Sequence, residues 1–172
     1  MGATHYVNIL YDNVMLKIKL IVVGAIKEPY LKLGIQEYEK RLGRFVQLST
    51  IEIPESISKQ DHQDAIKKSL ENDAKMIKQA IPEQAYVVVL DLQGKPFTSQ
   101  SLAKQLETIQ QKNSQIVLII GGSNGLDDSI KHIAKERWSF SQLTFPHQLF
   151  RLMLLEQLYR GMTILEGHPY HK

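Results

Sequence analysis

Two apolar runs in the second half of the chain each end in a glycine turn, at residues 90–94 (LDLQG) and 121–125 (GGSNG). Glycine tolerates positive φ and close approach of other groups, so peptide N–H and C=O groups in such turns can hydrogen-bond an adenine edge or a ribose. Ordinary connecting loops would show the same spacing, because GGSNG matches neither GxGxxG nor GxxxxGKS/T. The turns are candidates for binding a nucleotide-like ligand, and spacing alone leaves both interpretations open.

A third candidate segment, residues 140–145 (FSQLTF), comes just before Pro146. The proline forces Phe145 away from helical geometry, which predicts an extended loop. The loop is either an aromatic plug of the core or an adenine wall lined by Leu143 and Phe145, with Thr144 as a polar contact. These interpretations are compatible, since ligand pockets are mostly apolar with a few placed polar groups.

An arginine lies within an unusually apolar segment, residues 147 to about 165. This pattern predicts a helix covered by the sheet on one side and by a second subunit on the other. Arg151 needs a partner if it is buried, and we consider an RNA phosphate, a ligand carboxylate or a carboxylate of the other subunit. His147 is interpreted as a satisfied histidine at the helix end, and Glu156 with Arg160 as a structural i,i+4 pair.

The chain ends in HPYHK, which combines aromatic, imidazole and ammonium groups. These groups can stack on an unpaired base and hold its phosphate. Chain termini also commonly fray, and the residue types alone favour fraying.

The elements that must position these residues alternate between strand and helix. In the first half we expect a strand at 16–24, a helix at 28–42, a β-rich segment at 46–53, and a second helix that ends at Pro82 and has Ile66, Leu70, Ile77 and Ile81 on one face. In the second half we expect a strand at 85–92 that ends in a Gln93-Gly94 turn, then a helix capped by Thr98 or Ser99. A strand at 116–120 follows, and GGSNG then opens a helix with Asp127 and Asp128 at its start. Such alternation predicts an α/β fold with a mostly parallel sheet flanked by helices. The two glycine turns then lie side by side at the carboxyl ends of strands.

Length and composition restrict the possible classes. The 172 residues are 43% hydrophobic, enough for one core, so we expect a single domain at 15–172 preceded by an extension or alternative start at 1–14. The absence of cysteine excludes disulfides, thiolate nucleophiles and Cys-based zinc sites. No apolar run is long enough for a bilayer and no signal peptide is recognisable, which predicts a soluble cytoplasmic protein without a membrane partner.

The charge is modest. A formal net charge of +3 and a pI near 9.0 fit a polyanion partner only if the excess is concentrated on one surface. Four lysines, Lys67, Lys68, Lys75 and Lys78, are interpreted as a solvated helix face.

Several motifs occur together in order: KIKLIVVG, EYEKRLGRF, GGSNGL, SFSQLTFPHQLFRLMLLEQLYR and GHPYHK. Through them, residues 16–172 resemble the family of ribosomal RNA large subunit methyltransferase H, a small branch of the SPOUT methyltransferases. The resemblance implies an S-adenosylmethionine-dependent enzyme that methylates N3 of a pseudouridine in 23S ribosomal RNA. It further implies a homodimer that acts on the assembled ribosome, not on DNA, and a C-terminal trefoil knot.

The resemblance also implies site residues. Those for the cofactor are Leu90, Gly121, Phe140, Ser141, Gln142, Leu143, Thr144 and Phe145, with no metal. Arg151, Tyr170 and His171 would face the target base, from the same subunit or across the dimer interface. His171 could take the N3 proton, or Arg151 could stabilise the imide anion.

Two other classes stay open. A flavodoxin-like or dinucleotide-binding protein would explain the glycine turns but should carry a phosphate-binding fingerprint, which this sequence lacks. A non-catalytic RNA-binding module would explain the basic tail but would not need a pocket made by three loops.

Overall fold

The computed structural model describes residues 15–56 and 62–170. The extension expected at 1–14 and the candidate His171 lie outside this part. In chain order the elements are β1 (Leu16–Val23), α1 (Pro29–Leu42), β2 (Val46–Ile53), α2 (Gln63–Ala80), β3 (Tyr86–Pro96), α3 (Ser99–Gln110), β4 (Gln115–Ile120), α4 (Asp128–Ile133), β5 (Glu136–Ser139) and α5 (His147–Leu165).

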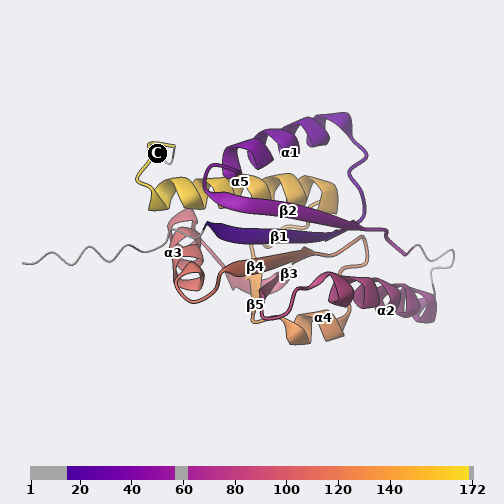
Figure 1. The fold of residues 1–172 in the computed structure, drawn as a ribbon. Coiled ribbons are helices and arrows are strands. Elements are labelled where there is room, and N and C mark those ends of the chain that lie inside the picture. The colour runs from indigo at the N-terminus through magenta and orange to yellow at the C-terminus, as the bar shows by residue number, and fades with distance from the viewer. Residues whose placement is uncertain (1–14, 57–61, 171–172) are drawn as a thin grey trace, which may run out of the picture.

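The strands form one parallel sheet in the order β2-β1-β4-β3-β5. Helices α1, α3 and α5 cover one face, and α2 and α4 cover the other (Figure 1). The α/β fold with a parallel sheet between helices is therefore confirmed.

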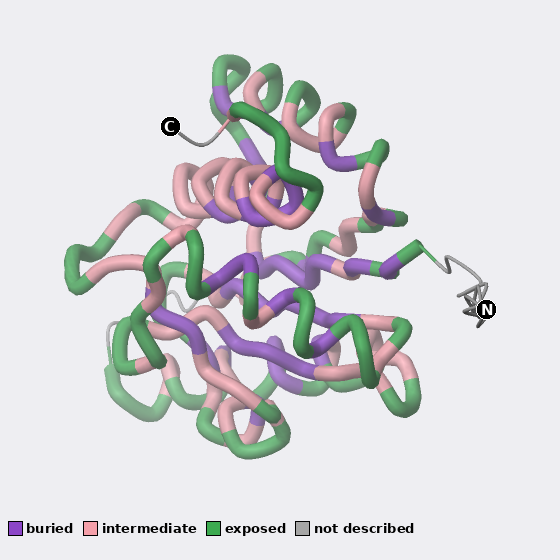
Figure 2. Tube along the Cα trace, turned by 90° about the vertical axis from the view of Figure 1, so that its left-hand side faces the viewer, coloured by how far each residue is buried: buried purple, intermediate pink, exposed green. Residues whose placement is uncertain are grey.

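The centre of the sheet is buried on both faces, as Figure 2 shows, whereas the edge strand β2 carries exposed residues between buried ones. On β1, Ile18 and Leu20 pack toward α1 and α5, whereas Ile21 and Val23 pack toward α2 and α4. Burial on both sides explains the continuous apolar runs at 87–90 in β3 and 116–120 in β4, whereas β1 begins with an alternating stretch, LKIKL.

Most elements agree with those expected from the sequence, and three points differ: the end of α2, the end of β3 and the presence of β5. Helix α2 ends at Ala80, one residue before Ile81. Strand β3 does not end at a Gln93-Gly94 turn: the register shifts between Leu90 and Lys95, and pairing with β5 then continues to Pro96. Strand β5 itself was not expected. The four α2 lysines are exposed, as expected.

Helix α5 is buried or half-buried along its whole length. It packs on the sheet and is flanked by α1 and α3 (Figure 1), so the sheet-side cover is confirmed and the second subunit stays a prediction. Glu156 and Arg160 form the expected ion pair, with Oε1 and Nη2 2.5 Å apart. Among the described helices, none combines the length and apolar character that a membrane span requires.

Candidate functional site

A cavity of about 270 Å³ opens at the carboxyl ends of the strands. Three segments build it: the end of β3, the turn after β4, and the segment from β5 into α5. The lining residues are 90–92, 120–122, 124–126, 131, 138–141, 143–145, 147 and 150. Residues 90–92 of β3, the GGSNG turn and the FSQLTF loop, far apart in sequence, therefore meet at one site.

The β3 side of the cavity is held by a partly exposed ion pair between Asp91 and Arg137. Asp91 Oδ2 accepts from Arg137 Nη2 at 2.6 Å and from its Nε at 3.1 Å, and Asp91 Oδ1 accepts from the Gln93 N–H at 3.0 Å. Burial raises the pKa of Asp91, but these hydrogen bonds outweigh it, so the net pKa lies below the usual value. The carboxylate thus ties the irregular part of β3 to β5, next to Leu90.

The turn after β4 requires its glycines. A Cβ at Gly121 would stand 2.5 Å from the Gly125 carbonyl oxygen, so no larger residue fits. Gly125 has φ +82° and donates its N–H to Gly122 O at 3.0 Å. Asp127 then caps α4 by accepting from the Ser129 N–H at 2.8 Å.

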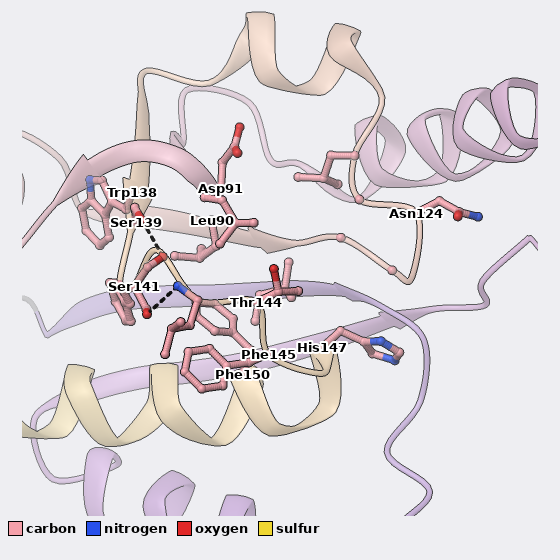
Figure 3. A pocket seen from close by; sticks show the side chains of 18 of the residues that line it. Leu90, Asp91, Asn124, Trp138, Ser139, Ser141, Thr144, Phe145, His147 and Phe150 are labelled. Carbon is pink, nitrogen blue, oxygen red and sulfur yellow. Dashed lines mark hydrogen bonds between the residues drawn. The ribbon is translucent and has the colours of Figure 1, made fainter. Parts of the chain in front are cut away.

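The FSQLTF loop supplies the third side and has no regular secondary structure, as expected. Phe140 packs on Phe150 with ring centroids 5.8 Å apart, so it serves as a core plug. Leu143 is 69% exposed at the mouth, and its N–H donates to Ser141 Oγ at 2.9 Å. In Figure 3, Leu90 stands on one side of the cavity and Phe145 and Phe150 on the other. The packing of Phe140 fits the interpretation as a core plug, and the adenine wall of Leu143 and Phe145 stays a prediction.

Of the eight candidate cofactor residues, seven line the cavity and Gln142 does not: it is exposed on the same loop. Trp138 also lines the cavity and was not among the predicted residues. Trp138 is fully buried, and its Nε1 donates to Glu136 Oε2 at 2.5 Å. It was missed because β5 was not recognised.

The family model described as "Predicted SPOUT methyltransferase" matches residues 16–171. The chain belongs to the SPOUT methyltransferase family. The "Ribosomal RNA large subunit methyltransferase H" of Caldicellulosiruptor saccharolyticus is 46% identical over 155 residues, covering 90% of this chain and 99% of the relative. The protein of the same name from Streptococcus suis is 46% identical over 159 residues, covering 91% and 100%.

Solved structures support the same fold. A probable methylase family protein from Haemophilus influenzae matches with TM-score 0.56 at 12% identity, over 90% of this chain and 70% of that one. The tRNA (m1G37) methyltransferase of Aquifex aeolicus matches with TM-score 0.51 at 13% identity, over 91% and 75%. This SPOUT methyltransferase is thus an enzyme whose family implies a methyl donor.

Arg151 of this SPOUT methyltransferase does not lie on the cavity. Its side chain is buried, its Nη1 donates to Glu52 Oε1 of β2 at 2.5 Å, and its Nη2 lies 3.9 Å from Glu39 Oε1 of α1. Within the described residues, its Nε has no hydrogen-bond partner. The structure shows a partner that the sequence analysis did not consider: carboxylates of the same chain, on β2 and α1, hold this guanidinium.

Tyr170 is docked rather than frayed, which corrects the expectation from residue types. Its hydroxyl lies 3.3 Å from Tyr38 Oη and donates to Glu156 Oε1 at 3.1 Å, while the Arg160 guanidinium sits 4.8 Å from its ring centroid. Burial first, and then the contacts with Tyr38 and Glu156, raise the pKa of the Tyr170 phenol. Tyr170 is therefore an anchored, protonated phenol at neutral pH.

The tail and the cavity lie at opposite ends of α5. Residues 147 and 150 at the start of the helix line the cavity, whereas Tyr170 follows the end of the helix (Figure 1). A helix of 19 residues is about 28 Å long. Within one chain, Tyr170 does not reach the cavity. His147, expected at a helix end, is the first residue of α5 and also lines the cavity, beside Gly24.

Proposed function

We propose that this SPOUT methyltransferase transfers a methyl group from S-adenosylmethionine to N3 of a pseudouridine in 23S ribosomal RNA, within the assembled ribosome in the cytoplasm. One observation carries the proposal: the three segments that the family resemblance assigns to the methyl donor converge on a single cavity. The near-full-length relatives named "Ribosomal RNA large subunit methyltransferase H" support the choice of substrate.

The cavity suits the proposed donor. Apolar groups such as Leu90, Phe145 and Ile120 provide surfaces for an adenine, and the backbone of residues 121–126 provides N–H and C=O groups for a ribose. A phosphate-bearing dinucleotide or flavin fits less well. The amide of Ser123, which a phosphate would need, already donates to the Glu55 carboxylate at 2.5 Å.

The chemistry requires alignment and removal of one proton. When bound, S-adenosylmethionine supplies a methyl group on a sulfonium, and its transfer to an imide nitrogen is favoured by alignment in a dry pocket. The loops 90–92, 121–126 and 140–145 would exclude water and orient the donor. We propose that His171 accepts the N3 proton, because Arg151 is held by Glu52 and the raised pKa of Tyr170 opposes a phenolate base.

This assignment requires two subunits. A two-fold dimer with antiparallel α5 helices would bring the tail of one chain to the cavity of the other. Tyr30 and Leu33 of α1 support such an interface, since they are 67% and 68% exposed and apolar or aromatic. In that arrangement Tyr170 would anchor the tail that crosses the interface.

We also propose that the chain is knotted, as the family implies. The chain changes from the α4 face to the α5 face directly after β5 (Figure 1). Within β5, just before this change of face, the chain lies so close to β3 that a Cβ at Gly94 would stand 2.6 Å from the Trp138 carbonyl carbon. The proposal of a knot rests on the family resemblance, and this change of face next to β3 is compatible with it.

The proposal is tested by transfer of labelled methyl groups from S-adenosylmethionine to three substrates: assembled ribosomes from cells lacking this activity, free 23S ribosomal RNA, and tRNA. We expect labelling of the ribosomes to exceed labelling of both free RNAs. Preferential labelling of tRNA would contradict the substrate. Ribosome binding without any donor binding would instead support a non-catalytic RNA-binding module, and a copurifying flavin would support the dinucleotide-type alternative.

A further inference from the structure

The glycine turn of the cavity is held from outside by a carboxylate that belongs to a distant loop. Glu55 lies two residues beyond the end of β2, at the edge of the sheet. Its Oε1 accepts the Ser123 N–H at 2.5 Å, across a separation of 68 residues. The side chain therefore reaches past the end of β1 to the turn that follows β4.

Gly122 leaves room for this contact. A Cβ at Gly122 would stand 2.5 Å from Glu55 Oε1 and 3.0 Å from its Cδ. Gly121 is needed for the fold of the turn itself, whereas Gly122 is needed because Glu55 lies against it.

The loop that carries Glu55 is itself anchored. The next residue, Ser56, donates its N–H to Asp73 Oδ1 at 3.0 Å, and Asp73 is buried on α2. A charged acceptor that is held in place makes a stronger hydrogen bond than a freely moving one, because less ordering accompanies the contact. The loop thus connects α2 to the Gly121–Gly125 turn, through Ser56 on one side and Glu55 on the other.

We propose that Glu55 is a positioning residue that holds the Gly121–Gly125 turn in the shape that receives the methyl donor. The identity of the ligand in this inference rests on the proposed function, whereas the contact between Glu55 and Ser123 does not depend on it. Glu55 is not among the residues that line the cavity, so it would act through the turn. Without it, Ser123 would lose its acceptor and the turn would sample other conformations before binding.

The test compares Glu55→Ala, Glu55→Gln and the control Glu71→Ala, an exposed carboxylate on α2. The first readout is amide exchange of Ser123, measured by NMR without any ligand. Loss of a hydrogen bond to a charged acceptor should accelerate exchange about tenfold or more in Glu55→Ala. Glu55→Gln keeps an oxygen acceptor and should restore most of the protection, and Glu71→Ala should resemble the wild type.

The second readout is the dissociation constant for S-adenosylmethionine, followed by the fluorescence of Trp138, the only tryptophan, which lines the cavity. We expect about tenfold weaker binding for Glu55→Ala and recovery to within about threefold for Glu55→Gln. Unchanged exchange of Ser123, or unchanged donor affinity despite faster exchange, would overturn the inference. If the wild type bound no donor, the proposed function would fail and the positioning role with it, while Ser123 exchange would still show whether the tether exists.

Discussion

The most discriminating substitution in the cavity is Gly121→Ala, with Gly125→Ala in the same turn for comparison. A Cβ at 121 would stand 2.5 Å from Gly125 O, 2.6 Å from Gly125 C and 2.9 Å from Leu126 Cγ. The first two are backbone atoms that cannot rotate away, so the turn must open by about 0.5 Å. Overpacking of this kind costs about 1–3 kcal/mol, or roughly 2–12 °C in Tm for a domain of this size.

Gly125→Ala isolates backbone strain from collision. Nothing lies within 4 Å of a Cβ at 125, and only its φ of +82° is unfavourable. The cost should be about 1 kcal/mol. Because Gly121 shapes the cavity wall, its substitution should also weaken S-adenosylmethionine binding more than tenfold, and clearly more than Gly125→Ala does.

Both effects can be measured on the same samples, Tm by thermal denaturation and donor affinity by Trp138 fluorescence. The reasoning would be refuted if Gly121→Ala kept the wild-type Tm and donor affinity. It would also be refuted if Gly125→Ala weakened donor binding as much as Gly121→Ala, because collision would then not be the cause.

Three further outcomes follow from the observed contacts. A double-mutant cycle of Arg151→Met and Glu52→Gln, measured by urea unfolding, should give a coupling free energy of about 1 kcal/mol. The coupling is this small because the Glu52 side chain is 44% exposed, and additive effects would contradict the ion pair. The pKa of Asp91 is lower in the folded state, so its contribution to the free energy of unfolding is full above about pH 4 and is lost as pH falls further. The difference in the free energy of unfolding between wild type and Asp91→Asn should therefore shrink below about pH 4. A constant difference would argue against the ion pair with Arg137. Tyr170→Phe should accelerate amide exchange over residues 168–170 without affecting β4, and unchanged exchange would mean that its hydroxyl does not anchor the tail.

The elements that sequence reasoning recovered are those whose own residues determine them. Helix α1 has Pro29 at its first turn and a helical spacing of buried side chains, and α5 is apolar throughout. Continuous apolar runs identified β3 and β4 as buried parallel strands, and the pattern LKIKLIVV identified β1 as a strand. The loop 140–145 was placed correctly because Pro146 restricts the residue before it.

The features that were missed depend on partners distant in sequence. Strand β5 has only four residues, with charged Glu136 and Arg137 beside buried Trp138, so neither alternation nor an apolar run marks it. The β3 irregularity exists only because β5 pairs on both sides of it. Arg151 finds Glu52 across 99 residues, and no local pattern distinguishes that carboxylate from a ligand or a second subunit.

The central claim is that this cavity serves methylation of a pseudouridine in the large ribosomal subunit. Its most direct test is nucleoside mass spectrometry of 23S ribosomal RNA from cells that lack this protein, complemented with the wild type or with Gly121→Ala. We predict that N3-methylpseudouridine is absent without the protein, returns with the wild type, and returns weakly or not at all with Gly121→Ala at equal protein level. If the modified nucleoside persisted in cells lacking the protein, or the wild type failed to restore it, the proposed function would be contradicted.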